Sequence, residues 1–221
     1  MKKLTFAALA AFSIGSAQAV VIFESADGSG LNPRFGIATT TTAGITNVTG
    51  DPNAGFADLY GPNASPFPAG VTPGGTITGS ADVQFVGGTA QGASDARIFF
   101  RFYADADNSG GINFGEGSEF ANRVEILGDF GEFDETLSTV QTILTTGQIP
   151  LVDQAGNTIN LFEYGIALPQ FNEQGNATSP NDVVGDYNVN VSNISFEATP
   201  EPTSTIMLGL AGILGLARRR R

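Results

Sequence analysis

Apolar and polar residues alternate with a period of two through much of the central part of the chain. Residues 20–23 form a short apolar run, and residues 82–85 alternate between polar and apolar. Within 97–103, one face carries Ile98, Phe100 and Phe102, and the other carries Arg97, Phe99 and Arg101. A period of two is typical of β-strands, because successive side chains point to opposite faces. The pattern predicts a β-rich fold with 97–103 as a core strand.

Two further segments predict strands with particular irregularities. Residues 158–167 are expected to pair with 151–152 through the turn-forming residues 153–157, as a hairpin. In the last strand, one parity holds Tyr187, Val189 and Val191, and the opposite parity holds Ile194 and Phe196. One extra residue would produce such a shift, so the pattern predicts a β-bulge near Ser192 or Asn193.

One segment has helical spacing. Asp134 fits an N-cap, Gly147 fits a stop, and the stripe between them contains Leu137, Val140, Ile143 and Leu144. Several short strands separated by Gly, Pro and Asn turns, with one short helix, predict an antiparallel β-sandwich of jelly-roll type. No repeat of fixed period is present, which disfavours a solenoid.

The N-terminus has the three parts of a secretory signal peptide. Lys2 and Lys3 precede an apolar stretch at 4–14, and the residues 17–19 read Ala-Gln-Ala. Because signal peptidase accepts small residues at this site, cleavage after Ala19 is expected, with residues 1–19 as a signal helix. The alternative is a buried N-terminal helix.

The C-terminus is also divided into three parts. A Pro200-Glu201-Pro202 motif precedes an apolar run at 206–217, and the chain ends in Arg218, Arg219, Arg220 and Arg221. By the positive-inside rule the arginines would remain cytoplasmic and residues 20–199 would lie outside. The apolar run is shorter than the roughly 20 residues of a full membrane span, so a temporary anchor helix is expected. A plain tail anchor is the alternative.

This arrangement resembles a PEP-CTERM sorting signal, although Thr199 stands where many members have Val. Such signals occur in Gram-negative bacteria, often ones that make exopolysaccharide, where an exosortase processes the tail. The resemblance implies exosortase as a partner during export and a cell-surface or extracellular location, with exopolysaccharide as a candidate further partner. The N-terminal signal peptide implies signal peptidase as the other partner during export. It implies an address and not an activity. The expected divisions are 1–19, 20–199 and 200–221.

The amino-acid composition excludes several kinds of catalytic and metal-binding site. The chain contains no His, Cys or Trp, so a histidine-based triad, a cysteine nucleophile, a His/Cys zinc site and disulfides are excluded. Residues 20–199 contain no Lys and have 21 acidic residues against four arginines, a net charge of −17. Such a surface repels nucleic acid and anionic membranes and attracts cations. No nucleic-acid partner is expected, and membrane contact is expected only through the C-terminal segment.

Residues 105–116 resemble the calcium loop of the EF-hand, with acids at positions 1, 3 and 12 and Gly at position 6. The resemblance implies side-chain ligands from Asp105, Asp107 and Ser109, a carbonyl ligand from Gly111, Asn113 as a ligand directly or through water, and both carboxylate oxygens of Glu116. Ser109 departs from the usual Asp or Asn. The flanks do not predict the two EF-hand helices, because 97–103 alternates and Gly115 and Gly117 oppose a helix. A calcium loop outside an EF-hand is therefore expected, and a turn that binds no ion is the alternative.

Two other clusters have structural explanations. Four acids precede the expected helix and would serve its N-terminus, with a second metal site or a catalytic pair as the alternative: Asp129, Glu132, Asp134 and Glu135. The threonines at 39–42, with Thr46 and Thr49, predict a polar strand or loop more readily than an ice-binding array.

These observations favour a secreted, non-enzymatic surface or matrix protein with a structural calcium ion. A carbohydrate-binding module or adhesin is the alternative, and two or three aromatic residues on one exposed face would support it. A glycosidase with paired carboxylates is a remote alternative, which a buried acid of raised pKa in an apolar cleft would support.

Overall fold

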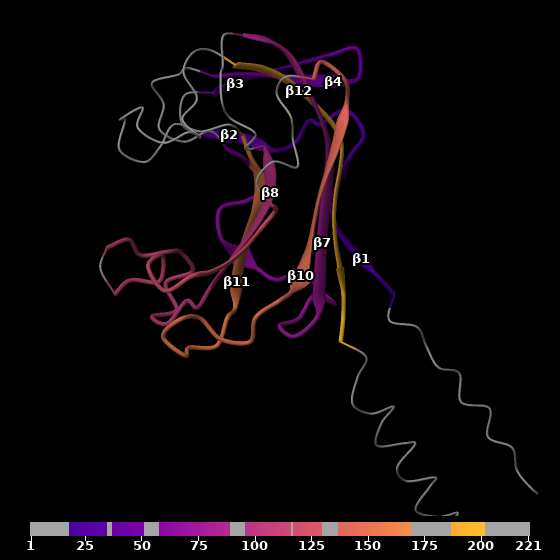
Figure 1. The fold of residues 1–221 in the computed structure, drawn as a ribbon. Coiled ribbons are helices and arrows are strands. Elements are labelled where there is room, and N and C mark those ends of the chain that lie inside the picture. The colour runs from indigo at the N-terminus through magenta and orange to yellow at the C-terminus, as the bar shows by residue number, and fades with distance from the viewer. Residues whose placement is uncertain are drawn as a thin grey trace, which may run out of the picture.

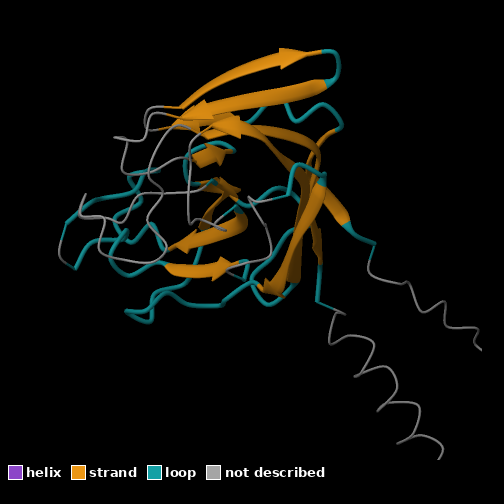
Figure 2. Ribbon diagram, turned by 45° about the horizontal axis from the view of Figure 1, so that its top comes forward, coloured by secondary structure: helices purple, strands orange, loops and turns teal. Residues whose placement is uncertain are grey.

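The structure is a computed structural model of the 221-residue chain. It describes residues 18–34, 37–50, 58–88, 96–115, 117–129, 137–168 and 187–201. Within these ranges every regular element is a β-strand (Figure 2). The expected signal helix and the expected C-terminal helix fall outside the described residues. The described part holds no helix that is long and apolar enough to cross a membrane.

The strands form two antiparallel sheets (Figure 1). Sheet A has the order β10-β7-β12-β4-β3, with β1 also paired to β12. Its strands are β1 (Val20–Ser25), β3 (Ile37–Thr42), β4 (Ile45–Gly50), β7 (Thr76–Gly88), β10 (Gln141–Gln148) and β12 (Tyr187–Thr199). Sheet B has the order β2-β5-β11-β8-β9, with β6 also paired to β11. Its strands are β2 (Asn32–Arg34), β5 (Asp58–Tyr60), β6 (Ser65–Pro66), β8 (Arg97–Tyr103), β9 (Val124–Leu127) and β11 (Leu161–Ala167).

The core lies between the two sheets. Phe196 of β12 meets Phe100 of β8 edge to face, with ring centroids 5.7 Å apart, and lies 4.8 Å from the ring of Tyr164 on β11. Ile98, Phe100 and Phe102 are fully buried, as the alternation predicted. Burying such side chains contributes about 25 cal/mol per Å² of apolar surface removed from water. The predicted antiparallel β-sandwich is confirmed, while the jelly-roll connectivity stays a prediction.

The bulge in the last strand is confirmed and has a clear role. The register of β12 on β7 shifts between Ser192 and Ser195, and Asn193 adopts a φ of 48°. Before the bulge β12 pairs with β4, up to Val191, and after it β12 pairs with β1, from Ile194. The bulge therefore marks the point where β12 exchanges one edge partner for another.

The predicted helix is wrong. Residues 141–148 form β10, which pairs with β7 from Gln141↔Val83 to Gln148↔Thr76. Ile143 is buried and Leu144 is 54% exposed, so the two residues point to opposite faces. This segment is rich in β-branched residues, which lose side-chain freedom in a helix and pack well on a sheet. All eight residues of β10 also pair in regular register with the edge of β7. Asp134, the expected N-cap, lies outside the described residues.

The remaining predictions of strands are close to the observed elements. Residues 20–23 lie in β1, 82–85 lie in β7, and the threonines at 39–42 lie in β3. The 151–158 hairpin is reduced to one bridge between Val152 and Thr158, and β11 begins only at Leu161. The Asp153 carboxylate closes the turn by accepting the backbone N–H groups of Ala155 and Asn157.

Candidate functional site

Residues 104–123, which we call the acidic loop, join β8 to β9 at one end of sheet B. It begins directly after Tyr103, and the side chain of Asn160 accepts the backbone N–H of Asp105 at 2.8 Å. No helix flanks the loop within the described residues, and the strands β8 and β9 stand on either side of it instead. The loop is therefore held at its start by the strand that precedes it and by a neighbouring side chain.

The first half of the loop folds around two aspartates. Asp105 accepts the backbone N–H groups of Ser109 and Gly110, each at 2.9 Å. Asp107 accepts the N–H of Ser109 at 3.0 Å and the side-chain amide of Asn113 at 2.8 Å. Aspartates favour such turns because their short side chains reach the backbone a few residues on. Hydrogen bonds from Ser109 and Asn113 lower the pKa of Asp107 to about 2, so this carboxylate is ionised at neutral pH.

A third carboxylate comes from Glu119, which is only 8% exposed. It accepts the backbone N–H groups of Ala106 at 2.8 Å and Asn113 at 3.0 Å. The chain reaches this position through a turn in which the Ser118 N–H donates to the Gly115 carbonyl and Gly115 and Gly117 have φ values of 128° and 73°. The two glycines that oppose a helix here are the residues that return the chain to the site.

Carboxylate oxygens of Asp105, Asp107 and Glu119 lie within 4.8 Å of one another. Three like charges at this separation repel each other, and a bound cation would remove that repulsion. All the donors are oxygens, which suits a hard cation such as calcium. Backbone N–H groups donate to each of the three carboxylates and hold them in place.

Five of the six predicted ligands lie in this described loop. The carboxylates of Asp105 and Asp107 lie close together, and the side-chain amide of Asn113 donates to Asp107. The Ser109 hydroxyl faces the N–H of Gly111 at 3.4 Å, within the same turn. Glu116, the expected bidentate ligand, lies outside the described residues. The sequence analysis did not predict Glu119, because the EF-hand calcium loop has twelve residues and ends at position 116. Gly115 and Gly117 were the sequence signal that the chain turns back toward the site.

A second polar cluster lies beside the loop on sheet B. One nitrogen of Arg34 lies 3.0 Å from Asp58 and 2.7 Å from Glu163, and both carboxylates are buried. Arg101 lies 3.6 Å from Asp58 and 3.7 Å from Glu163. Burial raises the pKa of Asp58 despite these arginines. The two arginines and two carboxylates balance in formal charge, so this cluster is neutral overall.

The same cluster extends to Tyr103 and Glu125. The Tyr103 hydroxyl donates to Glu163 at 2.9 Å, and burial raises the pKa of Tyr103, so the hydroxyl keeps its proton. Glu125 accepts hydrogen bonds from Arg101 and Arg123, each at 2.8 Å. Burial raises the pKa of Glu125, but these two arginines outweigh burial and leave the pKa below its ordinary value.

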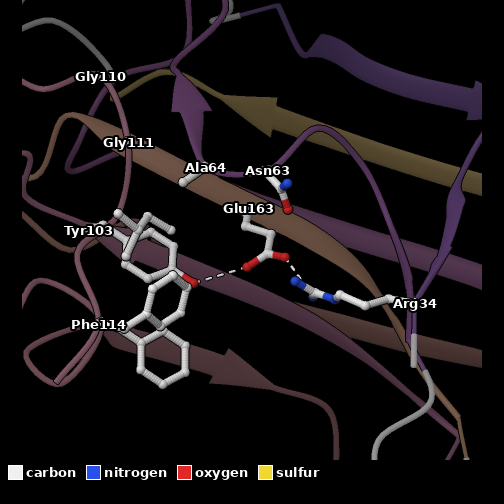
Figure 3. Close-up of a pocket in the computed structure, with 10 residues that line it drawn as sticks. Arg34, Asn63, Ala64, Tyr103, Gly110, Gly111, Phe114 and Glu163 are labelled. Carbon is white, nitrogen blue, oxygen red and sulfur yellow. Dashed lines mark hydrogen bonds and ion pairs between the residues drawn. The ribbon is translucent and has the colours of Figure 1, made fainter. Parts of the chain in front are cut away.

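A cavity of about 320 Å³ lies between this cluster and the acidic loop. Its polar side is formed by Arg34, Asn63, Tyr103 and Glu163, and its apolar side includes Phe114 and Phe120. Figure 3 shows the Tyr103 hydroxyl and the Arg34 guanidinium on either side of the Glu163 carboxylate, with the Asn63 amide pointing toward this pair. The backbone of Gly110 and Gly111 in the acidic loop lines another wall. The candidate metal site and the cavity therefore share one loop.

Three solved structures to which the chain is similar are distant likenesses. The chain is similar to the CBM22-1 xylan-binding domain of Paenibacillus barcinonensis Xyn10C, with a TM-score of 0.42, 11% identity, and coverage of 82% of this chain and 96% of that one. For the CBM22-2 xylan-binding domain of the same protein, the TM-score is 0.43 and the identity 10%, with coverage of 80% of this chain and 99% of that one. For a cyclase from Fischerella sp. TAU, the TM-score is 0.38 and the identity 11%, with coverage of 83% of this chain and 98% of that one. At these scores the likenesses say nothing about what this chain binds, and no curated protein matches its sequence.

The C-terminal prediction is supported by a family model. Residues 198–221 match the PEP-CTERM protein-sorting motif, and this range includes every predicted sorting residue from Pro200 to Arg221. The motif is the recognition signal for exosortase processing and indicates export to the cell surface. The chain therefore carries a PEP-CTERM sorting signal behind an antiparallel β-sandwich.

Proposed function

We propose that this chain is an exported, non-enzymatic surface or matrix protein whose acidic loop binds one calcium ion that stabilises the β-sandwich. The observation that carries the proposal is the convergence of the Asp105, Asp107 and Glu119 carboxylates within 4.8 Å. The sorting motif supports an extracellular location. Extracellular calcium modules bind the ion weakly, with dissociation constants of about 10⁻⁴ to 10⁻³ M, so a weak site suits that location.

The chemistry of the loop favours calcium over other ions. Carboxylate, hydroxyl, amide and carbonyl oxygens are the donors available between residues 105 and 119. Calcium takes six to eight oxygen ligands in flexible geometry, whereas zinc and copper prefer imidazole and thiolate ligands, and this chain has no His or Cys. Glu119 would replace or supplement Glu116 as the acidic ligand that closes the site.

A non-enzymatic role is supported by the way the buried acids are held. Asp58 has the raised pKa that a catalytic acid would need, but it lies among arginines and not in an apolar cleft. Both oxygens of Glu163 already accept hydrogen bonds, from Arg34 and Tyr103. Carboxylates paired in this way act as structural charges more readily than as proton donors.

Thermal unfolding with calcium and with chelator tests the proposal. A ligand that binds only the folded state stabilises that state by mass action, so 10 mM calcium should raise the melting temperature by about 3 to 10 °C. The substitutions Asp105→Asn and Glu119→Gln should each abolish the rise. Glu24→Gln is the control, because Glu24 is an exposed carboxylate on β1.

The same measurement on Glu116→Gln decides which glutamate closes the site. If Glu119 alone is the ligand, Glu116→Gln keeps the full calcium response. A parent protein whose melting temperature ignores calcium, or responds equally in all variants, would show that the loop is only a turn.

A further inference from the structure

We propose that the cavity between sheet B and the acidic loop binds a neutral sugar residue of an extracellular polysaccharide. The cavity has one polar side and one aromatic side, which is the usual composition of a small-molecule site. Its volume of about 320 Å³ accommodates a sugar ring. The cavity lining does not include the three clustered carboxylates, so side chains of the cavity can be changed without removing a carboxylate of the candidate metal site.

The charge of the cavity favours a neutral ligand. Arg34 and Arg101 face Asp58 and Glu163, so the fixed charges at the polar side cancel. The rest of the exported part is strongly acidic and repels polyanions. A ligand with hydroxyl groups gains hydrogen bonds here without needing an unpaired protein charge.

The polar groups match what a sugar offers. Each hydroxyl both donates and accepts, and it needs protein partners of both kinds. Each oxygen of Glu163 accepts one hydrogen bond from Arg34 or Tyr103, and a carboxylate has about four acceptor sites. The exposed Asn63 amide, which points toward Glu163 and Arg34 in Figure 3, provides both a donor and an acceptor.

The aromatic side provides a surface for the apolar face of a sugar ring. Phe114 is 75% exposed, the largest value among the exposed large apolar residues that the structure describes. It rests on Phe120, with ring centroids 5.0 Å apart, and Phe120 is itself covered by the Arg123 guanidinium at 4.1 Å. The Phe114 ring is thus supported from one side and open on the other, as an aromatic platform requires.

The position of the acidic loop adds a dependence on calcium, and this part rests on the proposed function. Gly110, Gly111 and Phe114 belong to the loop and line the cavity. Ordering of this loop by an ion would fix the cavity wall in advance and reduce the ordering cost of sugar binding. Calcium should therefore tighten sugar binding, while sugar binding itself does not require the ion.

Saturation-transfer NMR on the exported protein tests the proposal with methyl glycosides of glucose, galactose, mannose and xylose, and with methyl glucuronide as the charged comparison. At least one neutral glycoside should receive saturation and bind measurably in the millimolar range. Phe114→Ala and Asn63→Ala should each weaken that binding by about tenfold. Leu151→Ala, which removes another exposed apolar side chain, is the matched control and should change nothing.

Both test positions are exposed, so these variants should melt at the temperature of the parent. No binding of any neutral glycoside, binding of the glucuronide alone, or binding that survives both substitutions would overturn the proposal. Asp105→Asn separates the two proposals: it should remove the effect of calcium and leave the glycoside binding measured with chelator unchanged. Phe114→Ala should weaken glycoside binding and leave the calcium-induced rise in melting temperature intact.

Discussion

Three arginines, Arg34, Arg101 and Arg123, share the carboxylates at the centre of sheet B. Each guanidinium also lies over an aromatic ring: Arg34 over Tyr60 at 4.1 Å, Arg101 over Phe99 at 4.3 Å, and Arg123 over Phe120. The planar guanidinium suits both contacts at once, which a lysine would not provide. In a chain with so few cations, their gathering in one cluster explains how buried carboxylates are tolerated.

Glu125→Gln should destabilise the protein in a pH-dependent way. The pKa of Glu125 is lower in the folded state than its ordinary value, so its contribution is present above pH 4.5 and is lost as the pH falls through the lower folded value. Losing two charge-assisted hydrogen bonds should reduce the free energy of unfolding by about 1 to 2 kcal/mol at pH 7.

Urea unfolding at pH 7 and pH 3.5 measures this effect. The difference between parent and Glu125→Gln should shrink at the lower pH, and the exposed Glu197→Gln should differ little from the parent at either pH. A difference that is unchanged or larger at pH 3.5 would contradict the assignment of the shift to Arg101 and Arg123.

The candidate site could be predicted only in part at this scale. The sequence predicted Asp105 and Asp107 as neighbours because side chains at alternating positions of a tight loop converge on one point. Glu119 could not be found by spacing, since its place depends on where the Gly115–Ser118 turn returns the chain. The cavity lining was also beyond reach, because Asn63, Tyr103 and Glu163 come from three separate segments that only the sheet order brings together.

Among the elements, β12 shows what a sequence pattern can specify. The parity change between Val191 and Ile194 predicted the bulge, because a slip of one residue moves side chains to the opposite face. The pattern could not show that β4 and β1 meet β12 on either side of it, since pairing partners are not encoded locally. The failure at β10 has a similar cause: its apolar spacing fits a helix, and pairing with β7 decided the outcome.

The conformation of Asn193 gives a test of the bulge. Its φ of 48° is costly for most side chains, and its N–H donates to the Ala26 carbonyl at 3.0 Å. Asn193→Val should destabilise the protein by about 1 to 2 kcal/mol, because a β-branched residue is strained in the left-handed region. Asn193→Gly should cost clearly less, although it loses the hydrogen bond from the Asn193 amide to Asp82.

Chemical unfolding of both variants compares the two effects. If Val and Gly at this position were equally destabilising, the side-chain bond to Asp82 would matter more than the backbone conformation, and the bulge would be less constrained than its geometry indicates.

At the scale of the whole molecule, the sorting signal and the net charge of the exported part are consistent with each other. The sorting motif directs the chain outward, and the part that is exported is strongly acidic and contains no cysteine. The acidic loop concentrates three of these carboxylates next to a neutral cavity, so the proposed ion site and the proposed sugar site lie at the same end of the sandwich. The two proposals therefore link a stabilising ion and a bound saccharide through a single loop.

Calorimetric titration of the exported protein with calcium chloride tests the central claim most directly. The titration is run at constant ionic strength, with magnesium chloride as the comparison, because general screening would affect both ions alike. We predict one saturable calcium site per chain with a dissociation constant of about 10⁻⁴ to 10⁻³ M, lost in Asp105→Asn and Glu119→Gln. Heats that do not saturate, that are equal for magnesium, or that persist in both variants would contradict the account.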